Sequence, residues 1–392
     1  MNIYWSICLA HNSKPNGKLK IAILGSRGIP AAYGGFETIA EELGSGLAKR
    51  GFEVYVSCES KGLKIKPYAS YKGVQLVYFP VVEALRSVSE PFLYDFLSVL
   101  WATLRVDVIY MLGYSSIPTL VFPRLLGKTV LVNVDGLEAD RRKFNSVLRF
   151  FYRSFEKLSS KIADYIIVDS MAIGVYYKAN YGVAPVYIPN GGGGVREVTP
   201  SDPSVLKRYG IKKGDYYLVI ARLIPDNNID LIIEGFKRAH SPKKLVIVGP
   251  LEKSNYVKRL LQEKSDNVFF IGGVYDLPLQ RALRYNCFAY IHGHEKGGTN
   301  PSLVEALSCR SIVLTLDVPF TREVAEDSAI YFKKDADDLK MRINELKIKS
   351  FIGANEKAYE IYQKKYSSEH TIYAFTEFVN YIKDKRKTRE VA

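Results

Sequence analysis

Residues 20–30 read KIAILGSRGIP, and they decide the fold of this chain. Lys20–Leu24 is a short apolar run typical of a buried strand, and a glycine-containing loop follows it. Phe36–Arg50 carries apolar residues at helical spacing, and Phe52–Cys58 has the pattern of a second strand. This order of strand, loop, helix and strand predicts the start of a parallel sheet covered by helices.

The same alternation continues in two series, so we expect an α/β fold with two Rossmann-like halves. The first series is expected at Val74–Pro80, Glu90–Leu104, Asp107–Leu112, Thr129–Val134, Asp140–Lys161 and Tyr165–Val168. The second is expected at Tyr216–Ile220, Asn228–Ala239, Lys244–Val248, Asn255–Lys264, Val268–Ile271, Leu277–Tyr285, Phe288–Ile291, Pro301–Ser308 and Ser311–Leu314.

Glycine and proline mark the boundary between the two halves. Gly191–Gly194 is a run of glycines that is costly to order, so it predicts a hinge. The expected organisation is an N-terminal extension (1–18), an N-terminal domain on the acceptor side (19–190), a hinge (191–203), a C-terminal domain (204–366), and a C-terminal helix with a basic tail (367–392) that returns to the N-terminal domain.

Composition limits the classes of function. The chain has 392 residues and a net charge of +14, which favours anionic partners such as phosphorylated ligands or an acidic membrane surface. Its cysteines are scattered, which indicates a reducing, cytoplasmic compartment. His292 and His294 lack a nearby third ligand, so we expect no metal and no cofactor. No stretch has the length and hydropathy of a membrane span.

The most informative motif is Gly297–Glu305, GGTNPSLVE, because it joins a strand to a helix through glycines. Asn300 is placed to cap the helix and Pro301 to begin it. The free N–H groups of such a helix start attract phosphate, and Glu305 could accept hydrogen bonds from a ribose diol. A tight turn with a solvated glutamate would have the same pattern.

Arg222 follows the first strand of the second half. Its planar guanidinium could bind a phosphate at the same sheet edge, although a surface arginine would look identical in sequence. A nicotinamide-dependent oxidoreductase is disfavoured, because the loop at Gly25–Pro30 lacks the full glycine fingerprint.

Taken together, the motifs resemble glycosyltransferase family 4, whose fold is called GT-B. The matching segments are GGFE at Gly34–Glu37, IPNG at Ile188–Gly191, ARLIPDNNIDLIIEGF at Ala221–Phe236, IVGP at Ile247–Pro250 and GGTNPSLVEA at Gly297–Ala306. NVDGLE at Asn133–Glu138 and GGTNPS at Gly297–Ser302 are similar to a subgroup of bacterial rhamnosyltransferases.

The resemblance implies a retaining, metal-independent enzyme that uses a nucleotide sugar. It implies that Arg222 binds the pyrophosphate and that Glu305 holds the ribose. Asp135, after a strand of the N-terminal half, is a third candidate catalytic residue, which would orient or deprotonate the acceptor; a helix cap is the alternative. The expected donor-binding residues are Arg27, Gly34, Gly35, Asn190, Arg222, Asn227, Gly249, Gly273, Gly297, Gly298, Thr299, Asn300 and Glu305.

Two positions depart from the family pattern. A lysine usually follows the arginine by five residues, and here that position is Asn227. The first glutamate of the family's paired-glutamate motif falls on Gly297. We hypothesise that Arg27, in the loop after the first strand, supplies the missing positive charge to the diphosphate.

A basic and aromatic stretch in the N-terminal half suggests contact with the inner face of the plasma membrane. Its candidate residues are Arg142, Lys143, Arg149, Phe150 and Arg153. The residues at 144, 147/148, 151, 155 and 158 share one helical face, which a buried core would also explain.

The resulting hypothesis is transfer of a hexose or deoxyhexose, rhamnose from dTDP-rhamnose first, to a lipid-linked or growing saccharide in capsule, cell-wall or exopolysaccharide synthesis. UDP-glucose or GDP-mannose is the alternative donor. A non-catalytic protein that binds nucleotide sugars or polyanions is the alternative of another class, and no nucleic-acid partner is expected.

Overall fold

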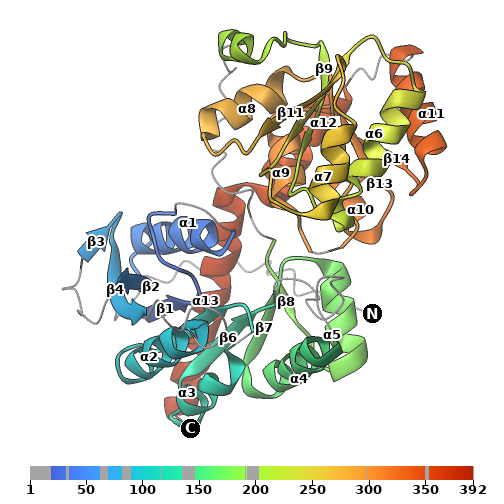
Figure 1. Ribbon diagram of the computed structural model, residues 1–392. Coiled ribbons are helices and arrows are strands. Elements are labelled where there is room, and N and C mark those ends of the chain that lie inside the picture. The colour runs from blue at the N-terminus through green and yellow to red at the C-terminus, as the bar shows by residue number, and fades with distance from the viewer. Residues whose placement is uncertain are drawn as a thin grey trace. The chain divides into compact units, whose positions relative to one another are not determined.

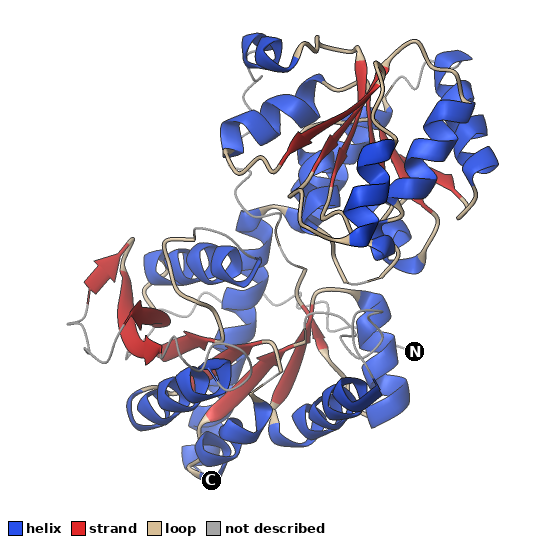
Figure 2. Cartoon of the chain, viewed as in Figure 1, coloured by secondary structure: helices blue, strands red, loops and turns tan. Residues whose placement is uncertain are grey.

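The computed structural model of the protein describes residues 19–31, 35–61, 69–81, 90–114, 116–134, 146–189, 191, 203–296, 298–348 and 353–391. The chain divides into two compact units. One contains the chain up to Gly193 together with the segment from Ser368, and the other contains Gly194–Ser367. Each unit has its own sheet, flanked by helices (Figures 1 and 2). The predicted α/β class with two Rossmann-like halves is therefore confirmed.

The N-terminal unit is built on an eight-stranded sheet. Its elements are β1 (Lys20–Leu24), α1 (Gly35–Lys49), β2 (Glu53–Lys61), β3 (Ala69–Tyr71), β4 (Val74–Val81), α2 (Glu90–Arg105), β5 (Val108–Leu112), α3 (Val121–Leu125), β6 (Thr129–Asn133), α4 (Ser146–Ile162), β7 (Tyr165–Val168), α5 (Met171–Tyr181), β8 (Val186–Tyr187) and α13 (Ser368–Val391). The strand order is β3-β4-β2-β1-β5-β6-β7-β8.

All neighbouring strands of this sheet pair in parallel except β3 and β4, which form a hairpin. The hairpin turn is Lys72-Gly73, where φ is 51° and 86°, as a two-residue turn requires. Strand β3 was not predictable from the sequence, because three residues leave too short an alternation to recognise.

The C-terminal helix α13 completes the core of the N-terminal unit. Its Phe375, Phe378, Val379 and Ile382 are buried in one cluster with α1 and with alternate residues of β1 and β5. Helices α1 and α13 approach closely, since a methyl group added at Gly46 would lie 2.6 Å from Ile372. The helix expected to return to the N-terminal half therefore does so (Figure 1).

Helix α4 faces the core differently from the pattern expected of it. The residues 140–145 at its expected start lie outside the described residues. Its buried positions include Glu156 and Ser159, whereas Phe151 on the expected core face is 51% exposed. The cause is a pair of hydrogen bonds to a buried carboxylate. The hydroxyls of Tyr114 and Tyr181 donate to Glu156 at 3.1 Å each, so the side of α4 that carries Glu156 faces the core.

The C-terminal unit has a six-stranded, all-parallel sheet. Its elements are β9 (Tyr216–Ile220), α6 (Ile229–Arg238), β10 (Lys244–Val248), α7 (Asn255–Gln262), β11 (Val268–Gly272), α8 (Leu277–Asn286), β12 (Ala289–His292), α9 (Pro301–Ser308), β13 (Val313–Leu316), α10 (Pro319–Ala325), β14 (Ala329–Phe332), α11 (Ala336–Ile348) and α12 (Ala354–Ile361). The strand order is β11-β10-β9-β12-β13-β14.

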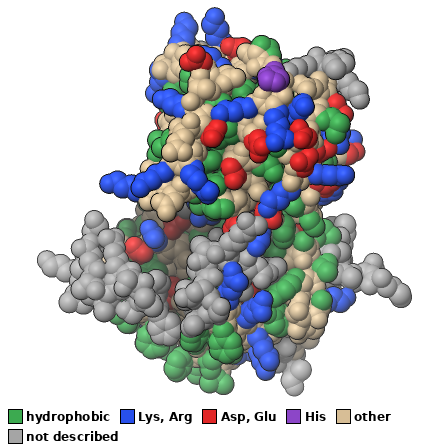
Figure 3. Space-filling view, turned by 45° about the vertical axis from the view of Figure 1, so that its right-hand side comes forward, with side chains coloured by type: hydrophobic (Ala, Val, Ile, Leu, Met, Phe, Trp, Pro, Cys, Tyr) green, Lys and Arg blue, Asp and Glu red, His purple; other side chains and the backbone are tan. Residues whose placement is uncertain are grey.

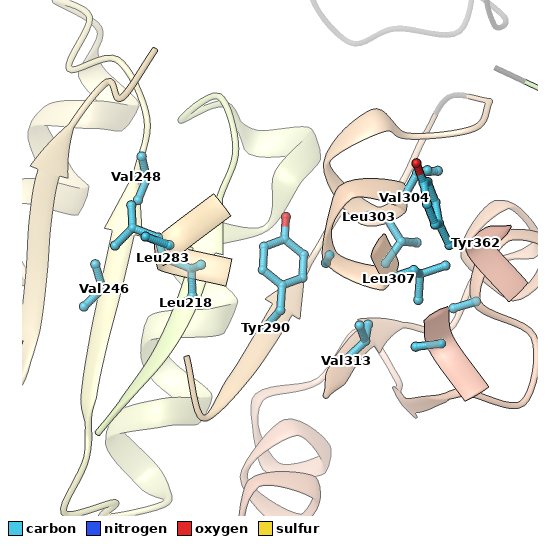
Figure 4. Close-up of a cluster of buried hydrophobic side chains, with 14 of the residues drawn as sticks. Leu218, Val246, Val248, Leu283, Tyr290, Leu303, Val304, Leu307, Val313 and Tyr362 are labelled. Carbon is cyan, nitrogen blue, oxygen red and sulfur yellow. The ribbon is translucent and has the colours of Figure 1, made fainter. Parts of the chain in front are cut away.

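Apolar side chains of the strands and of α9 meet in one buried cluster of this unit (Figure 4). Leu218, Val246 and Tyr290 come from three strands, and Leu303 and Leu307 come from α9. Because α9 packs its apolar side on the sheet, its first turn is fixed at the carboxyl edge of the strands. The core thus positions the loop before α9, which is predicted to bind phosphate.

Candidate functional site

The sheet of the C-terminal unit brings the two predicted phosphate-binding elements together. β9 and β12 are neighbours, and the strand order changes direction between them. Arg222 follows the end of β9 by two residues and is exposed, and Gly298–Asn300 lie between β12 and α9. Ligands of open α/β sheets bind at this kind of switch point, outside the carboxyl ends of the strands.

The start of α9 has the predicted cap. The side chain of Asn300 accepts a hydrogen bond from the Ser302 N–H at 3.0 Å, and Pro301 occupies the first helical position. Thr299 is buried, and Gly298 is partly exposed on the same loop. Backbone N–H groups at such a helix start favour an anionic ligand.

Tight backbone packing holds the Arg222 loop against the sheet edge. A methyl group added at Gly249 would lie 2.2 Å from the Ala221 carbonyl oxygen, and one added at Gly293 would lie 2.4 Å from the Asn227 carbonyl oxygen. Only glycine permits these approaches. Gly249 therefore shapes the loop, and Gly293 is a second shaping residue, which was not predicted from the sequence.

Asn227 also shapes this loop. Its side chain is almost completely buried, and its amide nitrogen donates to the Arg222 carbonyl at 2.7 Å. The Asn227 side chain therefore holds the backbone of the Arg222 loop, and a donor contact at Asn227 stays a prediction. An uncharged side chain at this position can be buried, where a lysine would keep its charge in solvent.

Glu305, the expected ribose ligand, forms a buried ion pair with Arg284 of α8. The Glu305 side chain is 15% exposed and that of Arg284 only 3%. Burial raises the pKa of Glu305 above its usual range, and the Arg284 guanidinium opposes that shift. The carboxylate that would accept hydroxyls of the nucleoside sugar is thus held in place by an arginine from another helix.

A polar network links this pair to the Arg222 loop. Arg284 donates to Ser302 Oγ at 3.2 Å, and Ser302 Oγ donates to the Ile220 carbonyl at 3.0 Å. The Tyr290 hydroxyl lies 2.7 Å from Ser302 Oγ and 3.2 Å from the same carbonyl. Because Ile220 ends β9, the network fixes β9, β12, α8 and α9 relative to one another at the switch point.

His292, at the end of β12, lies below the loop. Its ring stacks on His294 with centroids 5.5 Å apart, and both line a small cavity with Lys296, Gly298 and Asn300. Burial, followed by the charge of His294, lowers the pKa of His292 well below its usual range, so its imidazole is neutral. Among the described residues, no group of three or more His, Cys, Asp or Glu side chains is arranged to bind a metal ion.

Site residues of the N-terminal unit are described only in part. Arg27 follows β1. Its highly exposed side chain lies 3.9 Å from the Glu59 carboxylate, and its backbone N–H donates to the Glu37 carboxylate at 3.1 Å. Gly35 begins α1 and is exposed, while Gly273 in the other unit approaches Tyr275 closely. The following expected residues lie outside the described part of the chain: Gly34, Asp135, Arg142, Lys143, Asn190 and Gly297.

Sequence reasoning missed Arg284, Tyr290 and Ser302. Tyr290 lies inside an apolar strand and Ser302 inside the motif itself, so both look like ordinary core or helix residues. The role of Arg284 was only weakly recognisable from the sequence, by its place beside Leu283 among the buried positions of α8. An arginine on an apolar face requires an acidic partner, and that partner was not identifiable from spacing.

Two families match the chain. Residues 204–366 match the family described as Glycosyl transferases group 1. Residues 18–192 match a family described as Domain of unknown function (DUF1972). No curated protein sequence matches the chain.

Solved structures match over nearly the whole chain, at identities that establish the fold alone. Sucrose-phosphate synthase from Thermosynechococcus elongatus has a TM-score of 0.78 at 15% identity and covers 94% of this chain and 100% of its own. HepE from Anabaena in complex with UDP and glucose has a TM-score of 0.71 at 16% identity, covering 92% and 99%. The E. coli trehalose-6-phosphate structure bound with UDP-2-fluoro glucose has a TM-score of 0.69 at 11% identity, covering 91% and 98%.

These matches identify the arrangement of two Rossmann-like units as GT-B. The group 1 match coincides with the unit that holds Arg222, the Gly298–Asn300 loop and Glu305. The protein is therefore a glycosyltransferase with the GT-B fold, and its C-terminal unit is a group 1 glycosyltransferase domain.

Proposed function

We propose that the protein transfers a hexose or deoxyhexose, with retention and without a metal ion, from a nucleotide sugar bound in the C-terminal unit. The observation that carries the proposal is the shared sheet edge of Arg222, the α9 start and Glu305. Arg222 and the N–H groups of the loop would bind the diphosphate, and Glu305 would accept from the hydroxyls of the ribose or deoxyribose. Leaving-group charge is stabilised by such preorganised donors.

For the donor sugar, dTDP-rhamnose remains our first candidate, because GGTNPS and NVDGLE resemble the rhamnosyltransferase subgroup. UDP-glucose is the second candidate, because the HepE structure contains UDP and glucose and the E. coli structure contains UDP-2-fluoro glucose. GDP-mannose is the third. Because Asn227 is neutral and buried, the diphosphate site has one positive charge fewer than the family pattern, and we propose that Arg27 supplies that charge.

For the acceptor, we propose a lipid-linked or growing saccharide of capsule, cell-wall or exopolysaccharide synthesis, reached by the cytoplasmic protein at the inner face of the plasma membrane. Support comes from α4, where Arg149, Phe150 and Arg153 are all exposed. Asp135 is the proposed group that orients the acceptor hydroxyl.

The test is a screen of dTDP-rhamnose, UDP-glucose and GDP-mannose by thermal shift, with mass spectrometry to detect transfer and slow hydrolysis. We expect one nucleotide sugar to stabilise the protein and to be turned over, and Arg222→Ala to lose both effects while keeping its unfolding transition. An absence of stabilisation and turnover with all three sugars would refute the proposed set of donors.

A further inference from the structure

Helix α2 exposes apolar side chains on its outer side and mixes apolar with polar side chains on its buried side, where Tyr94, Val99 and Ala102 lie. Its inward side chains include Asp95, Ser98 and Thr103, all buried. The two hydroxyls are satisfied internally: Ser98 donates to the Asp95 carbonyl at 2.8 Å, and Thr103 donates to the Val99 carbonyl at 2.7 Å. Its outward side chains at helical spacing are the exposed Leu93, Leu100 and Leu104.

The neighbouring helix α3 continues the outward apolar face. The rings of Phe96 on α2 and Phe122 on α3 are in edge contact, with centroids 6.3 Å apart. Leu104 is 69% exposed, Leu125 is 78% exposed and Leu126 is 62% exposed. We name this the α2–α3 face, and it consists of Leu93, Leu100, Leu104, Val121, Phe122, Leu125 and Leu126. A contiguous apolar patch on a protein surface marks a docking site.

The exposed charges of the segment that carries the α2–α3 face are of one sign. Between residues 93 and 164, every described charged side chain that is exposed is a cation, and every described acid there is buried or only partly exposed. The exposed cations are Arg105, Arg124, Arg149, Arg153, Lys157 and Lys161. Figure 3 shows hydrophobic and basic side chains together at the end of the N-terminal unit where Figure 1 places α2, α3 and α4.

From this combination we infer that the α2–α3 face is a membrane-docking surface that inserts its leucine and phenylalanine side chains into the interface of an anionic bilayer. Apolar side chains flanked by cations are complementary to acyl chains below acidic headgroups. None of the described helices has the length and hydropathy to cross a bilayer. The inference rests on the proposed lipid-linked acceptor, and it adds a surface that the α4 residues do not include.

A second copy of the chain fits the same face less well. A twofold dimer through the α2–α3 face would place its cations opposite their own copies, and like charges across an interface oppose association. An anionic bilayer meets the apolar and the basic side chains with complementary groups at the same time. The charge pattern therefore favours lipid over self-association.

The experiment is co-sedimentation of the full chain with vesicles of phosphatidylcholine alone or mixed with phosphatidylglycerol. We expect binding to be at least about tenfold tighter to the anionic vesicles, reduced by about 0.5 M salt but not abolished, because the apolar part is not screened. The variant Leu104→Ser/Leu125→Ser/Leu126→Ser is expected to weaken binding at least about tenfold at both salt concentrations, because it removes the inserted side chains.

The matched control is Val175→Ser/Leu261→Ser/Met341→Ser, which removes three exposed apolar side chains from other helices and is expected to bind like wild type. Wild-type binding by the leucine variant, or equal binding of the wild type to both vesicle types, would overturn the inference. So would a dimer in analytical ultracentrifugation that the leucine variant dissociates. Nucleotide-sugar turnover measured without lipid separates the two proposals, because it tests the donor site and not the face.

Discussion

At the scale of single residues, the Arg284–Glu305 pair is the most consequential contact of the site. Removing one partner of a buried pair leaves the other charge uncompensated, which typically destabilises a protein by about 3–5 kcal/mol. We expect Arg284→Met to lose stability of this order in urea unfolding. Arg284→Met/Glu305→Gln is expected to lose less than the sum of the single variants, and strict additivity would show that the two side chains are not coupled.

The same pair predicts a dependence of stability on pH. Without Arg284, burial alone raises the folded-state pKa of Glu305 above its unfolded value. A raised acid pKa favours the protonated folded state, so this contribution is present at low pH and is lost as pH rises through the folded pKa. Arg284→Met should therefore be more destabilised, relative to wild type, at about pH 8 than at about pH 5. A constant difference across this range would contradict the account, and Arg284→Met/Glu305→Gln is the control, because neither substituted side chain titrates.

Nucleotide binding gives a readout that a purely structural role of Arg284 would not change. A protonated carboxyl loses acceptor capacity for the hydroxyls of the nucleoside sugar, of which UDP offers two and dTDP, a deoxynucleotide, offers one. We expect the affinity of Arg284→Met for dTDP and UDP, measured by calorimetry, to rise more steeply as pH is raised from about 5.5 to about 8 than the affinity of Arg284→Lys, which keeps a cation beside Glu305. The change is about tenfold for each pH unit below the pKa of Glu305. Glu305→Gln should bind weakly and show only the pH dependence that comes from the terminal phosphate of the nucleotide, and a wild-type profile in Arg284→Met would exclude a positioning role.

At the scale of elements, the start of α9 has a matched partner within the same unit. Asn300 caps α9, and Ser254 caps α7 by accepting from the Val257 N–H at 3.1 Å. Loss of either cap should cost about 1 kcal/mol of stability. Only Asn300→Ala is expected also to weaken nucleotide binding, measured by calorimetry, because only the N–H groups of α9 face the proposed diphosphate. Equal nucleotide affinity of both variants would remove α9 from the site.

Some features of these elements were predictable from the sequence and others were not. The position of Arg222 just after β9 and the Asn300 cap were predictable, because each belongs to a local motif whose strand and helix are adjacent in the chain. Arg284 was not, since its partner Glu305 lies on another helix and only packing brings the two together. The inward side of α4 was missed for the same reason: Glu156 is buried by tyrosines from the loop after β5 and from α5, which no periodicity reveals.

At the scale of the whole molecule, the two units have separate cores. The cluster around Tyr290 and Leu303 belongs to the C-terminal unit, whereas Phe375 and Phe378 of α13 complete the N-terminal cluster. Helix α13, near the end of the chain, therefore stabilises the N-terminal unit. We expect two unfolding transitions in calorimetry, because each unit buries its own apolar surface.

Two perturbations should move these transitions independently. A saturating nucleotide at about 100 times its Kd stabilises only the unit that binds it, by about 2.7 kcal/mol. Gly46→Ala places a methyl 2.6 Å from Ile372 between α1 and α13, and overpacking of this kind costs about 1–3 kcal/mol. Gly174→Ala is the matched control, because its methyl meets only Val168 at 3.5 Å. The nucleotide should raise one transition, Gly46→Ala should lower the other, and Gly174→Ala should lower neither. A single transition shifted by both the nucleotide and Gly46→Ala would mean that the units unfold as one, and that α13 couples the donor site to the N-terminal sheet.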